Sequence, residues 1–99
     1  MLFAVRFDDH ADRLAVRLQH LQAHVEWLDA HRDQVLVGGS LRHAPHDAQP
    51  VGGLWIVEAD SKAAVEALMQ TDPFWVHGLR ARCEILAWSK SHPERKALV

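Results

Sequence analysis

The chain has 99 residues, of which 48% are hydrophobic and 24% are charged, so it is long enough for one domain with a core and too short for two. Eleven Lys and Arg residues against thirteen Asp and Glu residues give a formal net charge of −2, which argues against a nucleic-acid-binding surface. No apolar run reaches the length of a membrane span and the first residues do not resemble a signal peptide, so we expect a single cytoplasmic domain over residues 1–99.

The first part of the chain predicts a strand followed by a long helix. Residues 2–7 alternate between two sets of side chains, a pattern typical of a strand. Residues 12–33 carry an apolar stripe at intervals of four, three, four and three residues, formed by Leu14, Leu18, Leu21, Val25 and Leu28. At about 100° per residue, His24 lies roughly 80° from the centre of this stripe, with Arg17 on the same flank. We expect the stripe to face the core and His24 to lie at its margin.

Two strands with a long loop between them come next. Residues 34–42 predict the second strand and residues 54–59 the third, and the loop at 43–53 makes the two strands antiparallel. The paired glycines Gly38 and Gly39 mark either a bulge or a place where a ligand or another backbone approaches closely. Both interpretations stay open.

Histidine is unusually frequent, with eight copies in the chain. Three loop residues, His43, His46 and Asp47, are of metal-ligating types, but they lack a rigid scaffold, so we do not expect a metal site. We expect four other histidines to be solvated: His10, His20, His31 and His92. A surplus of imidazole groups also suits proton transfer, because histidine titrates near neutral pH.

The second half of the chain begins with two helix starts. Asp60 or Ser61 is expected to cap the second helix. Asp72 followed by Pro73 is a typical start of a further short helical turn, because the carboxylate accepts free backbone N–H groups and proline fits the first helical position. This turn is expected to end near Gly78.

Residues 79–88 predict the last strand, and residues 90–99 form a polar tail that we expect to be flexible or bound by a partner. The element order is therefore βαββαβ, which predicts a ferredoxin-like α+β fold with a four-stranded antiparallel sheet and both helices on one face. The other sheet face carries apolar side chains from the first and third strands. A naked face of this kind predicts a homodimer formed through it.

Five short motifs occur in an order and spacing that are informative together. They are Met1-Leu2-Phe3, Ala23-His24 with Leu28, Val37-Gly38-Gly39, Ala59-Asp60-Ser61-Lys62-Ala63-Ala64, and Thr71-Asp72-Pro73-Phe74 leading to Gly78. On these motifs the chain, to about Ser91, resembles the YCII-related family of the dimeric α/β-barrel superfamily. The resemblance implies a dimer whose sheets pack face to face and a pocket centred on His24 and Asp72. Some relatives act as dehydrochlorinases or lactone isomerases on aromatic breakdown products.

The chain departs from the family pattern at one position. Family members often carry an arginine three residues before the histidine, and this chain has Leu21 there. Arg17, two turns before His24 on the same flank, could supply a cation in its place.

A histidine held by a carboxylate has a fixed tautomer and can transfer a proton with its other nitrogen. The sequence has no nucleophile motif, phosphate-binding loop or dinucleotide fingerprint. We therefore expect cofactor-free elimination, isomerisation or tautomerisation of a small carbonyl-bearing or aromatic compound, with His24 and Asp72 as the catalytic residues. The expected substrate-binding residues are Arg17, Gly38, Ser40, Phe74 and Trp75, with Trp55 and Trp88 as further candidates for an apolar box.

Two classes of function stay open. The first is a small lyase or isomerase that uses the His24–Asp72 pair. The second is a non-catalytic binding or accessory protein in which Asp72 is only a helix cap. Contact between the two side chains within about 3.2 Å favours the enzyme, whereas a carboxylate bound solely to the N–H groups of residues 74 and 75 favours the binding protein.

Overall fold

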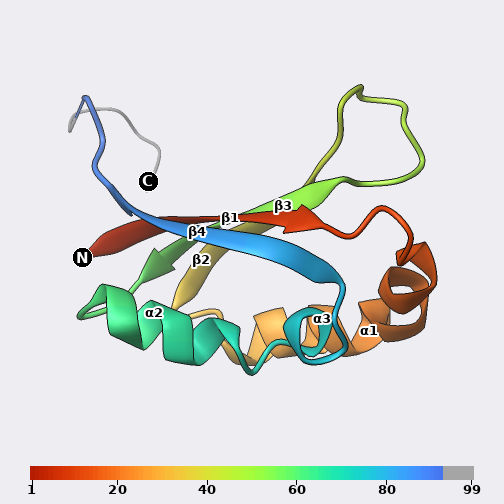
Figure 1. Cartoon of the computed structure of the whole chain (residues 1–99). Helices are drawn as coiled ribbons and strands as arrows, with labels where there is room; N and C mark the ends of the chain where they lie inside the picture. Colours follow the sequence, from red (N-terminus) through yellow and green to blue (C-terminus); the bar gives the residue numbers. More distant parts are fainter. Residues whose placement is uncertain (93–99) are drawn as a thin grey trace.

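The computed structural model describes residues 1–92, so most of the predicted tail at 90–99 lies outside the described residues. The elements in chain order are β1 (Leu2–Asp9), α1 (Leu14–Ala30), β2 (Val35–Leu41), β3 (Gly52–Glu58), α2 (Lys62–Met69), α3 (Pro73–Val76) and β4 (Arg80–Trp88). The strands form one antiparallel sheet in the order β2-β3-β1-β4, with the helices on one face of it (Figure 1). This confirms the ferredoxin-like fold expected from the sequence.

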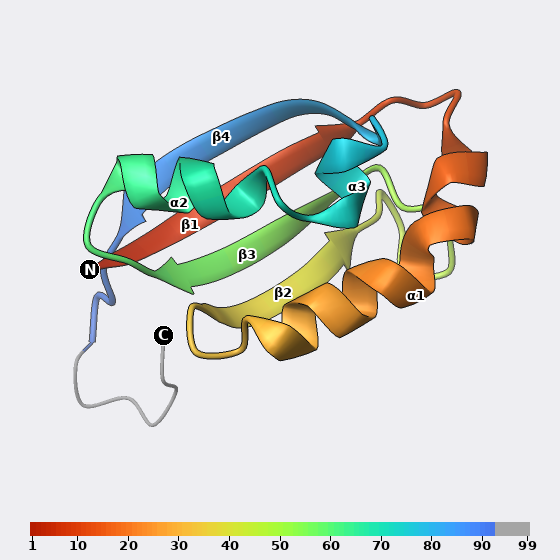
Figure 2. The ribbon, with the colours of Figure 1, turned by 90° about the horizontal axis from the view of Figure 1, so that it is seen from below.

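The core lies between the sheet and the helices. Phe3, Val5 and Phe7 point to this inner face of β1, and Trp55 and Val57 lie beside them on β3. Figure 2 shows α1 running along the β2 side of the inner face and α2 along the β1 and β4 side. The helices complete the core with three buried side chains: Trp27 from α1, and Val65 and Met69 from α2.

The buried face of α1 differs from the one expected. The apolar stripe is largely exposed, with Leu18 at 68%, Val25 at 49% and Leu21 at 45% exposure, and the buried residues of the helix are Arg17, His24 and Trp27. The prediction that His24 lies at the margin was therefore wrong, because His24 belongs to the centre of the buried face. The physical reason is that residues outside the helix supply partners for its polar groups, and apolar periodicity does not register such partners.

Among residues 1–92, no helix covers the outer face of the sheet (Figure 1). The large apolar side chains that alternation along the paired strands places there include these five: Val37, Leu54, Ile56, Leu86 and Trp88. One end of the same face is charged, with Arg6 and Asp8 on β1 opposite Glu84 and Arg82 on β4. In the described part of the chain, no helix has the length and apolar character needed to cross a membrane.

Candidate functional site

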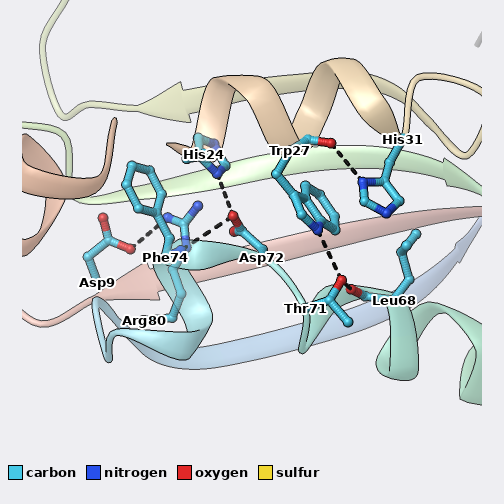
Figure 3. A network of polar contacts seen from close by, with 9 residues as sticks. All are labelled: Asp9, His24, Trp27, His31, Leu68, Thr71, Asp72, Phe74 and Arg80. Carbon is cyan, nitrogen blue, oxygen red and sulfur yellow. Dashed lines mark hydrogen bonds and ion pairs between the residues drawn. The ribbon is translucent and has the colours of Figure 1, made fainter. Parts of the chain in front are cut away.

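The side chains of His24 and Asp72 meet between α1 and the start of α3. Nδ1 of His24 lies 2.7 Å from Oδ1 of Asp72, across 48 positions of sequence (Figure 3). Oδ1 also accepts a hydrogen bond of 3.3 Å from the backbone N–H of Phe74, with Pro73 at the first position of the helix. Asp72 is therefore both the helix cap and the partner of the histidine. From the sequence alone, these two roles of Asp72 were alternatives.

Two aromatic rings hold the imidazole in place. The ring of Phe74 stacks on His24 with centroids 4.0 Å apart and planes 12° apart, and the ring of Trp55 lies at 6.5 Å. An ionised carboxylate can only accept, so a neutral His24 donates its Nδ1–H to Asp72. Its Nε2 atom bonds to no described residue and is not sealed from solvent. The neutral imidazole thus presents a free lone pair at Nε2.

A charged cluster of Asp9, Arg17 and Arg80 also lies beside Phe74. Both carboxylate oxygens of Asp9 are occupied, Oδ2 by Nη2 of Arg17 at 2.5 Å and Oδ1 by Nη1 of Arg80 at 2.8 Å. The guanidinium carbons of Arg17 and Arg80 lie 5.1 and 5.2 Å from the centroid of the Phe74 ring, and that of Arg80 lies 4.4 Å from the Phe7 ring. Phe74 therefore contacts the imidazole and two cations, of which Figure 3 shows Arg80.

A register shift between β1 and β4 creates this cluster. The pairing runs Asp8 to Arg82 and then Asp9 to Arg80, with one extra β4 residue between them. Alternation along β1 places Asp9 on the inner face, and the shift turns Arg80 to the same face. Burial lowers the pKa of Arg80 from its ordinary value, although the carboxylates of Asp9 and Asp72 oppose that effect. The guanidinium group stays charged, because an ordinary arginine titrates far above neutral pH.

Sequence reasoning did not find Asp9 or Arg80. The available signal was a pair of acidic residues, Asp8 and Asp9, at the end of one strand and the pattern Arg80-x-Arg82 at the facing start of another. Because charges at strand ends usually face solvent, this signal does not by itself place any of them inside. The bulge that buries one pair is a tertiary feature.

The structure brings together some of the other predicted site residues and separates others. A Cβ atom on Gly38 would lie 3.3 Å from the Trp55 ring, so the glycine leaves room for the tryptophan side chain. Ser40 is exposed, and its hydroxyl accepts a hydrogen bond from Arg42. Trp75 packs half-buried against the core, and no contact joins it to His24. Trp88 lies on the outer face and cannot line the site.

Three of the four histidines expected to be solvated, His10, His20 and His31, are half-buried instead, and His92 is exposed. The rings of His20 and His77 stack with centroids 3.6 Å apart, and His31 stacks on Trp27 at 4.3 Å. In the loop, the Asp47 side chain accepts a hydrogen bond from the backbone N–H of Ala44. Within residues 1–92, no group of three or more potential ligands is placed to hold a metal ion.

Cys83 is not an activated nucleophile. Burial raises the pKa of its thiol, and the nearby charge of Glu66 acts in the same direction. The surface hollow that it helps to line, with Arg6 and Arg82, is at the charged end of the sheet and apart from the His24–Asp72 pair.

The sheet topology and the site define a small α+β protein of the dimeric α/β-barrel type. Residues 1–89 match the YCII-related domain, and the chain belongs to the YCII-related family. No curated protein sequence matches the chain.

Two solved structures are similar to this one. The first is 5-chloro-2-hydroxyhydroquinone dehydrochlorinase (TftG) from Burkholderia phenoliruptrix AC1100, in a complex with 2,5-dihydroxybenzoquinone. It is 29% identical with a TM-score of 0.81, and the match covers 90% of this chain and 94% of that chain. The second, protein Atu4242 from Agrobacterium tumefaciens, is 16% identical with a TM-score of 0.52 over 94% of this chain and 98% of that chain. This second match is a likeness of fold alone.

Proposed function

We propose that the protein is a cofactor-free lyase or isomerase acting on a small hydroxylated or carbonyl-bearing ring compound, with His24 as the proton-transfer group and Asp72 as its partner. The observation that carries this proposal is the 2.7 Å contact between Nδ1 of His24 and Oδ1 of Asp72, together with the unoccupied Nε2 atom. Membership of the YCII-related family and the likeness to a dehydrochlorinase support small-molecule chemistry of this kind.

The mechanism follows from the two ring nitrogens. The carboxylate of Asp72 accepts the Nδ1–H bond, so the lone pair of the neutral ring is at Nε2 and is available to remove a proton from the substrate. The imidazolium that forms is then stabilised by the carboxylate. In a loss of HCl, chloride departs with the electron pair of the C–Cl bond while the proton goes to Nε2. In an isomerisation, Nε2 returns the proton at a different substrate atom.

Arg17 and Phe74 suit an anionic or polarised ring substrate. Only Nη2 of Arg17 is bound to Asp9, so the Nε and Nη1 groups remain free of described hydrogen-bond partners. Arg17 lies two turns before His24 on α1, and Phe74 lies between them. A substrate oxygen at Arg17 would therefore place the remainder of a small ring beside Nε2.

The alternative is a binding or accessory protein without catalysis. The bond of 3.3 Å from the Phe74 N–H gives the Asp72 carboxylate a structural role that needs no chemistry, but the contact with His24 means that this role is not its only one. Under either function, we propose a homodimer through the outer sheet face. The five apolar side chains of that face support this assembly.

The test uses 5-chloro-2-hydroxyhydroquinone as substrate and the release of chloride as the measurement. The wild-type protein is expected to release chloride, and His24→Asn is expected to lose the activity by about 10²–10⁴-fold. Asparagine is the matched change, because its amide can still donate to Asp72 while it cannot transfer a proton. Binding of 2,5-dihydroxybenzoquinone without any turnover of the chlorinated compound would support the accessory protein instead.

A further inference from the structure

We propose that Arg80 is a positioning residue of the site, which holds Arg17 through Asp9 and holds the His24–Asp72 pair through Phe74. This inference rests on the proposed function, since it assigns a role within the same site.

The surroundings of Arg80 are built around its guanidinium group. The side chain is 2% exposed, donates to Asp9 and lies against the rings of Phe7 and Phe74. A Cβ atom on Gly53 would lie 3.2 Å from Nη2 of Arg80, so this glycine lets the guanidinium rest on the backbone of β3. Burying a cation this completely costs free energy, and an apolar side chain could fill the same core position without that cost.

The link from Arg80 to Arg17 runs through one carboxylate. Asp9 uses one oxygen for each arginine, so a single negative charge faces two positive charges. Because Arg80 occupies Oδ1, Arg17 is held by Oδ2 alone and its other donors stay free. Without Arg80, the carboxylate could rotate to bind Arg17 with both oxygens, and those donors would be drawn away from the site.

The link from Arg80 to His24 runs through Phe74 and Asp72. Phe74 stacks on the imidazole, and its ring centroid also lies 5.2 Å from the guanidinium carbon of Arg80. Oδ2 of Asp72 and Nε of Arg80 are both sealed from solvent and bond to no described residue. Burial lowers the pKa of Arg80, and the charge of Asp72 opposes that effect to a smaller extent than the hydrogen bond and charge of Asp9.

A neighbouring pair provides the matched control. Arg82 bonds to Asp8 at 2.7 Å between the same two strands, but its side chain is 78% exposed and lies on the opposite sheet face. Loss of an arginine from β4 can therefore be compared at a buried and at an exposed position. Any effect of lower net charge is common to Arg80→Met and Arg82→Met.

The experiment is ¹⁵N-resolved NMR of the His24 ring in the full chain without ligand. In the wild type we expect a single Nδ1–H tautomer with a downfield proton signal from the bond to Asp72. Arg80→Met is expected to lose that signal and to give a mixture of tautomers, and Arg80→Lys is expected to keep part of the signal. Arg82→Met should match the wild type.

A folded Arg80→Met protein with the wild-type tautomer and proton signal would overturn the inference, even if its stability had fallen. Should Arg80→Met fail to fold, Arg80→Lys decides in the same way, because a wild-type His24 signature in that variant would show that guanidinium geometry does not position the pair. Absence of the Nδ1–H tautomer in the wild type would instead contradict the proposed function itself.

Discussion

Asp8 and Asp9 are consecutive residues of β1, yet their carboxylates bind arginines on opposite faces of the sheet. Asp8 pairs with Arg82 at 2.7 Å on the exposed face, and Asp9 pairs with Arg80 at 2.8 Å on the buried one. Successive side chains of β1 point to opposite faces of the sheet. The register shift in β4 places Arg82 and Arg80 on opposite faces as well, so each arginine meets its own aspartate. The two Asp–Arg pairs therefore differ in burial, and Asp9 also binds Arg17.

Asp9→Asn should destabilise the fold far more than Asp8→Asn. The buried change leaves two desolvated cations without a counter-charge, and loss of one partner from a buried ion pair costs about 3–5 kcal/mol. The exposed change should cost about 0–1 kcal/mol. Urea unfolding followed by tryptophan fluorescence measures both, and equal losses of stability would contradict the structural assignment of Asp9.

Substitutions of Asp72 can separate its two roles. Asp72→Asn keeps an oxygen that can cap Phe74 and accept from His24, so stability should change by less than about 1 kcal/mol while activity falls by about 10²–10⁴-fold. Asp72→Ala removes the cap and should lower stability by about 0.5–2 kcal/mol in addition. Thermal unfolding and chloride release on the same samples give the comparison. Full activity in Asp72→Asn would show that the mechanism does not need the negative charge of Asp72.

Two glycines in paired strands should respond differently to an added methyl group. A Cβ atom on Gly52 would lie 2.0 Å from the backbone oxygen of Phe7, which forces the two central strands apart. No atom lies within 4 Å of the corresponding position on Gly39. We expect Gly52→Ala to lose about 1–3 kcal/mol and Gly39→Ala to stay within about 0.5 kcal/mol of the wild type in urea unfolding. Similar losses in both would show that strand glycines are required for flexibility rather than for close approach.

The outer sheet face and the exposed stripe of α1 compete as sites of self-association. Leu86 on the sheet is 52% exposed and Leu18 on the helix is 68% exposed. A charge at the centre of a dimer interface is strongly unfavourable, so Leu86→Glu should convert the proposed dimer to monomer, whereas Leu18→Glu should leave it intact. Sedimentation equilibrium distinguishes the two. Dissociation by Leu18→Glu alone would move the interface to α1.

The sequence predicted the fold well because strand alternation and turn signals are local. The alternation of side chains over residues 2–7 predicts a strand, and Asp72-Pro73 predicts a helix start, without reference to any distant residue. Which face of α1 is buried could not be read from local sequence, because Arg17 and His24 are buried against partners from β1 and from the start of α3. The meeting of His24 and Asp72 was expected from the family resemblance, whereas the contribution of Arg80 depended on a bulge that no spacing reveals.

The short helix α3 links chemistry to local folding. It spans four residues, Pro73–Val76, and the same oxygen atom of Asp72 begins it and holds His24. A transient fraying of that single turn would release the imidazole while the four strands stayed paired. Activity would then be lost at a lower temperature or denaturant concentration than the one that unfolds the sheet. The turnover rate would therefore report the opening of this helical turn and not global unfolding.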